Sequence, residues 1–211
     1  MITKTVEDIL VLFNESNFKK NIENIGTPFL IAELESSRGG KGGMQAGTVR
    51  ENIVAASLEV FFKTSNVDCS SRITESDKDL LLFNQPLSIK TKTGLGNSGI
   101  KVIWTTDYAL ARKFISTYNP KTNLILVKIK WDGTGFFYLV PLVVQKRIFQ
   151  SLGRSHYLKP PASGRNCRGA EFTSIAIKKL INEDETVKIP IKFPKKDSIK
   201  INPTERWRKY F

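Results

Sequence analysis

The chain has 211 residues, with 33 Lys and Arg against 20 Asp and Glu, and its formal net charge is +13. Its length suits one domain, and a hydrophobic content of 40% is enough to bury a core, which excludes a disordered basic tail. The single histidine and two distant cysteines exclude two-histidine nucleases, HExxH metalloproteases, zinc ribbons and a disulfide framework.

The hydrophobic pattern predicts helices in the first part of the chain. Apolar residues recur at three- and four-residue spacings over 5–35, which is typical of helix. A glycine-rich basic loop over 36–47 separates this segment from a second predicted helix over 48–63. The apolar face predicted for this second helix consists of Val49, Ile53, Ala56 and Val60.

Strands and helices alternate in the rest of the chain. Residues 79–83 and 86–93 are predicted strands on either side of a short turn at Asn84-Gln85. The elements predicted after them are a strand over 100–104, a helix over 107–118, a hairpin of 123–131 and 135–140, a helix over 141–151, a basic loop over 153–169, a helix over 171–183 and a strand-like tail. This order predicts one mixed α/β (α+β) domain over 1–211, with a central mixed sheet flanked by helices.

The N-terminal sequence, the length of the apolar runs and the net charge indicate the compartment and the kind of partner. The N-terminus has no basic segment followed by an apolar stretch, and no apolar run approaches the ~20 residues that span a bilayer. We therefore expect a cytoplasmic protein without a membrane partner. A net charge of +13 favours a polyanionic partner, with nucleic acid ahead of an anionic membrane surface.

Asp79 and Lys90 are the first candidates for chemistry. With the turn at 84–85, Asp79 lies opposite Lys90, and paired residues have Cβ atoms about 5 Å apart. Ser88 and Lys92 share the face of Lys90 because side chains alternate along a strand. A carboxylate that holds a divalent cation, next to a lysine that orients or deprotonates water, suits phosphodiester hydrolysis. An ordinary cross-strand salt bridge is the alternative.

Glu51 has two interpretations. Thr48 and Glu51 have the spacing of a capping box that starts a helix. Glu51 also shares a second apolar stripe with Ala55, Leu58 and Phe62, which turns it towards the core. A buried carboxylate needs a cation or a hydrogen-bonding partner, and a metal ion shared with the strand carboxylate would satisfy it.

Two basic loops are candidates for DNA contact, because arginine forks match guanine edges and lysine and backbone amides match phosphates. Met44 is a flexible apolar side chain among glycines, which suits a wedge between base pairs, although it could instead fold back onto the core. No P-loop motif is present. The predicted DNA-binding residues are Arg38, Lys41, Met44, Gln45, Lys92, Arg154, His156, Lys159, Arg165 and Arg168.

A glutamate on an early helix, then Asp79, then Ser88-Ile89-Lys90 resembles the PD-(D/E)xK nuclease superfamily. With the Met44 loop, residues 38–93 resemble ThaI-type restriction endonucleases. The resemblance implies a PD-(D/E)xK core in which Glu51 and Asp79 bind Mg²⁺ (or Mn²⁺) and Lys90 acts on the attacking water. Ser88 stands where the second acid normally stands, so Glu51 is its natural substitute, and Asp77 competes with Asp79 for the metal.

The resemblance also implies a biological role. It points to a type II restriction endonuclease that works as a homodimer and cuts duplex DNA at a short palindromic G+C-rich site, CGCG for the ThaI type. A cognate DNA methyltransferase is the partner expected in the same system. The alternatives are another PD-(D/E)xK enzyme, such as a junction resolvase or repair nuclease, and a non-catalytic basic DNA-binding protein.

Overall fold

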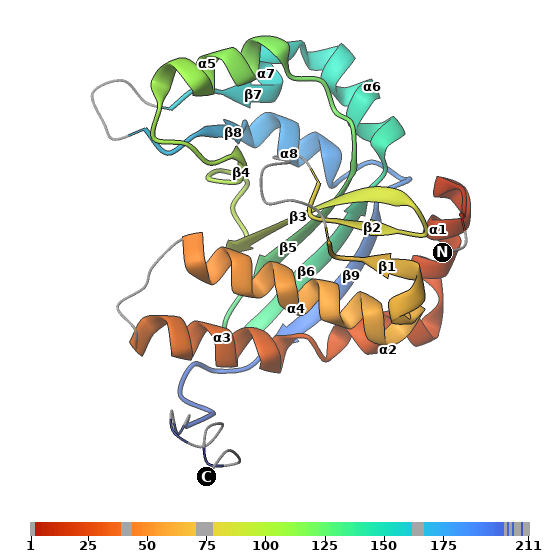
Figure 1. Cartoon of the computed structure of the whole chain (residues 1–211), viewed down its shortest axis with the longest axis vertical. Helices are drawn as coiled ribbons and strands as arrows, with labels where there is room; N and C mark the ends of the chain where they lie inside the picture. Colours follow the sequence, from red (N-terminus) through yellow and green to blue (C-terminus); the bar gives the residue numbers. More distant parts are fainter. Residues whose placement is uncertain are drawn as a thin grey trace.

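The computed structural model describes residues 3–38, 44–70, 78–161 and 167–200 and three residues of the tail, 202, 204 and 208, with the backbone only at 38 and 44–46. Helices lie on both sides of a central sheet, and a small second sheet lies on one of these sides (Figure 1). The helices are α1 (Val6–Asn14), α2 (Ser16–Glu23), α3 (Gly26–Arg38), α4 (Met44–Phe62), the 3₁₀ turn η1 (Thr64–Asn66), α5 (Tyr108–Thr117), α6 (Leu142–Leu152), α7 (Arg154–Tyr157) and α8 (Ser174–Leu180). The strands are β1 (Val67–Asp68), β2 (Leu80–Leu82), β3 (Gln85–Thr93), β4 (Lys101–Ile103), β5 (Asn123–Ile129), β6 (Gly133–Val140), β7 (Leu158–Lys159), β8 (Ala170–Phe172) and β9 (Val187–Phe193).

The main sheet is mixed, with the strand order β1-β2-β3-β5-β6-β9. Only the β3–β5 pair is parallel, and the other neighbours are antiparallel. All seven residues of β5 are buried, as expected for a strand whose two faces are both covered. The small sheet has the order β4-β8-β7. These observations confirm the predicted mixed α/β class with a central mixed sheet flanked by helices.

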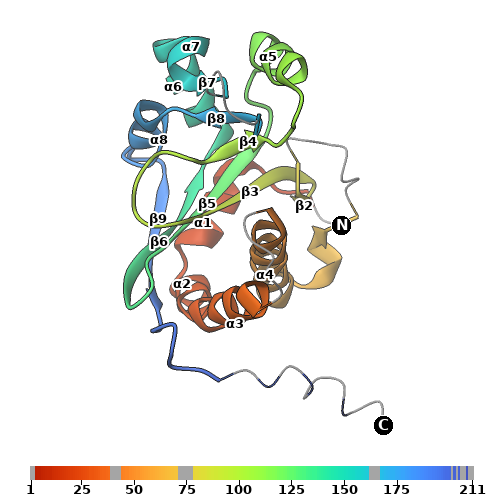
Figure 2. The same ribbon diagram turned by 90° about the vertical axis from the view of Figure 1, so that its left-hand side faces the viewer.

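Aromatic side chains fill the core between the N-terminal helices and the main sheet. The rings of Phe13 and Phe18 have centroids 4.3 Å apart. Phe62 of α4 stacks on both rings, at 5.6 Å and 5.5 Å. Phe137 of β6 lies 6.1 Å from each of them. The cluster therefore fixes α1, α2 and α4 to one face of the sheet, as Figure 2 shows from the side.

The other face of the sheet is covered by α6, α8 and the small sheet. Leu124, Leu126 and Val140 point to this side and pack with fully buried Tyr157 and with Phe172. The two faces of β5 therefore belong to two separate cores, the second formed by segments that follow β3 in the chain. In the part of the chain that the structure describes, no helix is long and apolar enough to cross a membrane.

Several predicted helix boundaries are wrong. The segment 5–35 is three helices, because the chain turns to extended backbone at Glu15 and ends α2 at Asn24. Helix α4 begins at Met44, within the predicted loop over 36–47, so Thr48 lies inside the helix and cannot be the N-cap of a capping box. The remaining part of that loop, 39–43, lies outside the described residues.

The predicted apolar face of α4 is also wrong. Val60 is 78% exposed and Val49 is exposed too, whereas Val54, Leu58 and Phe62 are buried. The helix carries two overlapping apolar stripes, and packing against the sheet buries the one that also contains Glu51.

The second basic loop, 153–169, is partly regular structure. It contains α7 and β7, and the chain then enters β8 before α8 begins at Ser174. The first of these elements follows its N-cap Gly153, whose φ of 70° is the left-handed conformation that glycine favours. Residues 162–166 of this segment lie outside the described part of the chain.

The burial of α4 predicts different costs for two truncations on the same helix. Leu58 is fully buried, so Leu58→Ala should lower the free energy of unfolding by about 2–5 kcal/mol through lost burial and a cavity. Val60→Ala, on the exposed face, should change it by at most about 0.5 kcal/mol. Urea unfolding of both variants measures the two values. Equal losses at the two positions would contradict the observed orientation of α4.

Candidate active site

Asp79 lies just before β2 and faces β3. The turn between the two strands is at Phe83 and Asn84, whose φ angles of 50° and 64° are left-handed, and Leu82 pairs with Gln85. Continuing this register places Asp79 opposite Ser88, and its backbone N–H donates to the carbonyl of Leu87 at 2.9 Å. The predicted pairing with Lys90 is therefore wrong. Because the shift is two residues, Asp79 stays on the predicted face and Lys90 is its diagonal neighbour.

Three donors from β3 hold the Asp79 carboxylate. Its Oδ2 accepts hydrogen bonds from Ser88 Oγ at 3.1 Å, from the backbone N–H of Ile89 at 2.5 Å and from Lys90 Nζ at 3.3 Å. Ser88 is buried, so its hydroxyl is a fixed donor. Among the described residues none donates to Oδ1, and the carboxylate is thus oriented through its other oxygen.

Glu51 reaches the same site from α4. Burial raises the pKa of its carboxyl; the positive charge of Lys90 opposes this rise, and the negative charge of Asp79 adds to it. Glu51 therefore lies within electrostatic range of both groups, although the three come from α4, the residue before β2 and β3. The interpretation of Glu51 as a core-facing carboxylate is therefore favoured over the capping box.

The donor set fits a hard divalent cation. Mg²⁺ prefers oxygen ligands and is commonly bound by one or two carboxylates, with water and substrate phosphate completing its shell. Asp79 offers a free oxygen, and Glu51 is a partly buried carboxylate that a cation would stabilise. In the described residues no group of three or more His, Cys, Asp or Glu side chains could hold a metal together. Asp77 lies outside the described residues.

The cleft beside Lys90 adds residues that the sequence analysis missed. Its far wall comes from the segment entering β5 and from α6, where the buried Gln145 donates to the carbonyl of Thr122 at 2.7 Å. These residues reach the site only because β3 and β5 pair in parallel, and no local pattern signals that pairing. The cleft is lined by Ser88, Lys90, Val102, Tyr118, Lys121, Thr122, Leu124, Gln145 and Phe172.

The predicted DNA-binding residues of the second loop differ in their surroundings. Arg154 and His156 are exposed on α7, and Arg154 donates to the carbonyl of Tyr118 at 3.3 Å. Lys159 lies on β7 and forms an ion pair of 2.9 Å with Glu171. The same carboxylate also pairs with Lys101, so the Lys159 charge is partly neutralised. Arg165 lies outside the described residues.

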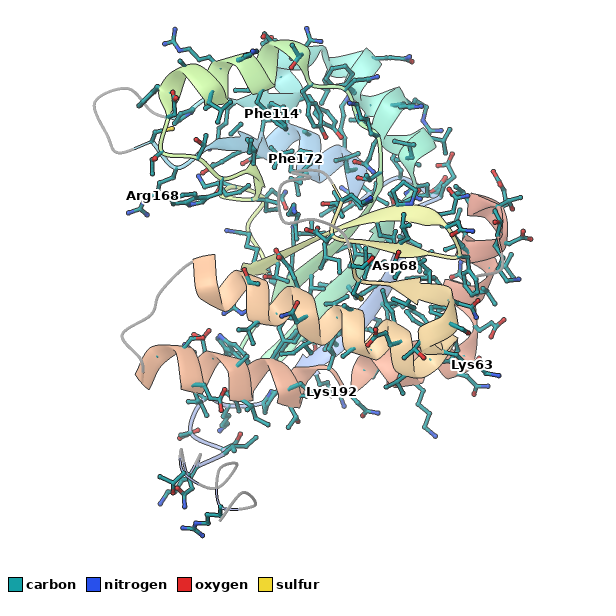
Figure 3. All side chains as sticks on the ribbon, viewed as in Figure 1. Lys63, Asp68, Phe114, Arg168, Phe172 and Lys192 are labelled. Atoms are coloured by element: carbon teal, nitrogen blue, oxygen red, sulfur yellow. The ribbon has the colours of Figure 1, made fainter. Side chains whose placement is uncertain are left out.

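The remaining candidates gather on one side of the molecule. Arg38 ends α3, and Met44 and Gln45 form the first turn of α4. These helix ends lie on the same side as exposed Arg168, which Figure 3 labels across from them. Half-buried Lys92 follows Lys90 on β3, and Lys41 lies outside the described residues.

Comparison with known proteins gives two matches. The model of the family "Restriction endonuclease ThaI" matches residues 16–211. A solved structure described as "Restriction endonuclease in complex with substrate DNA" is 39% identical, covers 96% of this chain and 98% of its own, and superposes with a TM-score of 0.88. No curated protein matches the chain. The family resemblance found from the motifs is thereby confirmed.

The raised pKa of Glu51 predicts a pH-dependent stability. The folded state binds the proton of the Glu51 carboxyl more tightly than the unfolded state does. The protonated carboxyl therefore stabilises the fold fully below the unfolded pKa, and this stabilisation is lost as pH rises through the folded pKa. In EDTA at neutral pH, Glu51→Gln should therefore raise the melting temperature, and the gain should shrink as the solution is acidified. Calorimetry between about pH 4 and pH 8 measures this trend.

Glu59→Gln, on the same helix, is the matched control and should show no such trend. A Glu51→Gln gain that is equal at every pH would contradict the burial of an ionised Glu51.

Proposed function

Because the chain belongs to the ThaI restriction endonuclease family, we propose that it is a Mg²⁺-dependent type II enzyme that cuts duplex DNA at a short palindromic G+C-rich site. The resemblance suggests CGCG as the site, and Mn²⁺ is the alternative ion. The observation that carries this proposal is the convergence of Glu51, Asp79 and Lys90 from three separate elements. A protein that only binds DNA has no need of a carboxylate pair and a lysine held in this way.

Each residue of the site has a role in hydrolysis. Asp79, through its Oδ1, and Glu51 would hold the cation, which when bound supplies Lewis acidity to the scissile phosphate. Ser88 Oγ and the Ile89 N–H fix the carboxylate of Asp79, so its ligand-facing oxygen is oriented before the substrate arrives.

Lys90 acts between the two carboxylates. Its ammonium group, 3.3 Å from Asp79 Oδ2, would orient or help deprotonate the attacking water and offset the negative charge that grows on the phosphate in the transition state. An imidazole is unnecessary in this scheme, which agrees with the single histidine of the chain.

The assembly follows from the symmetry of a palindromic site. We propose that the chain acts as one nuclease domain over 1–211, in a homodimer whose two protomers each cut one strand. It would act in the cytoplasm, where a cognate DNA methyltransferase protects the sites of the host.

The contacts to DNA would lie on the side of the molecule that carries the end of α3, the start of α4 and Arg168. Arginines would read guanine edges and the basic groups would contact phosphates. Met44 would insert between base pairs from the first turn of α4, and Gln45 would read a base edge beside it. The residues proposed for DNA contact are Arg38, Lys41, Met44, Gln45, Lys92, Arg154, His156, Lys159, Arg165 and Arg168.

Plasmid cleavage tests the catalytic proposal. The purified protein should give discrete bands with Mg²⁺ and none with EDTA, and Asp79→Ala and Lys90→Ala should each lower the cleavage rate at least about 100-fold. Asp197→Ala, at an exposed carboxylate, is the control and should cut normally. Absence of cleavage with any divalent ion would rule out the enzyme, and cutting restricted to branched DNA would indicate a resolvase.

A second experiment tests the wedge. Met44→Ala should weaken binding to a duplex with the cleavage site by about 10-fold or more and leave binding to random duplex nearly unchanged, because unstacking is used only at the specific site. Titration of fluorescent duplexes in EDTA measures both affinities. Val49→Ala, on the exposed face of the same helix, is the control. Unchanged specific affinity for Met44→Ala would argue against intercalation.

A further inference from the structure

The connection between β3 and β4 is held by hydrogen bonds with β5 that the proposed catalytic site does not explain. Residues 94–99 leave the main sheet directly after the strand of Lys90, and Gly94 and Gly99 have left-handed φ angles of 88° and 78°. The Gly94 N–H donates to the carbonyl of Ile129 at 2.7 Å and ties the start of the loop to β5. The start of this loop is therefore fixed to the main sheet.

Lys128 of β5 lies beneath the loop. Its side chain is 2% exposed, and Nζ donates to the carbonyl of Leu95 at 3.3 Å and to Asn97 Oδ1. The ring of Tyr138 lies 5.9 Å from the same nitrogen. Among the described residues no carboxylate pairs with Lys128, although a buried ammonium without a counter-ion is costly.

More positive charge lies at the same place. Lys92 pairs with Lys128 across the parallel strands, and a side chain at Gly99 would lie 3.6 Å from Lys92 Nζ. Burial, followed by the charges of Lys92 and Lys188, lowers the pKa of Lys128 to about 8. The loop itself has no acidic residue. A positive potential therefore acts through an uncharged glycine-rich segment.

The N–H groups of the loop are the part of its backbone that Lys128 does not contact. In the described part of the chain, no oxygen accepts a hydrogen bond from the N–H groups of residues 95–99. Leu95 is 41% exposed, and Gly96 and Ser98 are exposed as well. Figures 1 and 2 place the connection on the same side of the molecule as the N-terminal end of α4. Amide groups without a partner next to the buried Lys128 ammonium suit an anion such as phosphate.

We propose that residues 94–99 bind the phosphate backbone of the substrate duplex, and that Lys128 is the positioning residue that holds them there. This proposal rests on the proposed function, since it takes duplex DNA as the ligand. It adds a contact that carries no sequence information and fixes the duplex relative to Lys90, which lies on the strand leading into the loop.

Charge at Gly96 tests the contact with DNA. A side chain at Gly96 meets no atom within 4 Å, so Gly96→Ala should be neutral, whereas Gly96→Asp should lower affinity for a duplex of about 30 base pairs at least ten-fold in EDTA. For Gly96→Asp, the plot of log binding constant against log salt concentration should also have a slope that is shallower by about one unit, as for one lost phosphate contact. Asn182→Asp, in the exposed α8–β9 connection, controls for added charge.

Truncation of the lysine tests its positioning role. Lys128→Met should lower DNA affinity about three- to ten-fold and reduce the backbone order of 94–99 in heteronuclear NMR relaxation, without a lower melting temperature. Lys20→Met is the control, because Lys20 is exposed and lies on α2, which packs against the opposite face of the sheet. It should bind DNA within about two-fold of the unmodified protein.

The outcomes separate this proposal from the proposed function. If the unmodified protein binds and cuts DNA but Gly96→Asp binds as Gly96→Ala does, the phosphate contact is wrong and the nuclease stands. If Lys128→Met keeps both loop order and affinity, its positioning role is wrong. If the unmodified protein binds no duplex at all, both proposals fail together.

Discussion

The parallel pairing of β3 with β5 is the constraint on which the rest of the arrangement depends. Parallel neighbours cannot be joined by a tight turn, so the chain must leave the sheet after Thr93 and return before Asn123. That excursion forms β4 and α5, and it creates the loop 94–99. The pairing also sets Ser88, Lys90 and Lys92 beside the residues of β5 that face the second core. Residues of β3 thus contact the Asp79 carboxylate and also line the cleft.

This position explains why polar groups are tolerated on a mostly buried strand. Lys90 is half-buried, but it interacts with Asp79, and Glu51 lies close to both. The charges of Asp79 and Lys90 compensate each other, whereas the burial of Glu51 raises the pKa of its carboxyl. A divalent cation would remove that cost, so folding and metal binding favour the same arrangement of the two carboxylates. A site that is slightly unfavourable without its cation is a common feature of enzymes that bind a charged substrate.

The sequence predicted the direction of the candidate side chains better than the register of the strands that carry them. Glu51, Asp79 and Lys90 were expected together and do lie together, because alternation along a strand and stripes along a helix determine which way a side chain faces. The register between Asp79 and β3 was wrong, since it depends on left-handed backbone at Phe83, where glycine or asparagine would be expected. Asp79 still lies on the predicted face of the sheet, because a shift of two residues in the register preserves the face. The buried face of α4 was wrong for a different reason, as two apolar stripes competed and only packing decided between them.

Net charge alone does not indicate which lysines have a carboxylate partner. Lys159 carries a charge that the sequence assigns to DNA, but Glu171 binds it together with Lys101 across the small sheet. Lys128 shows the opposite case, since it lies in a strand of apolar residues and no local pattern marks it. Its burial arises only when β3, β5 and the loop 94–99 assemble. Which of these lysines pairs with a carboxylate is therefore decided by the assembly of the strands, and the local sequence does not indicate it.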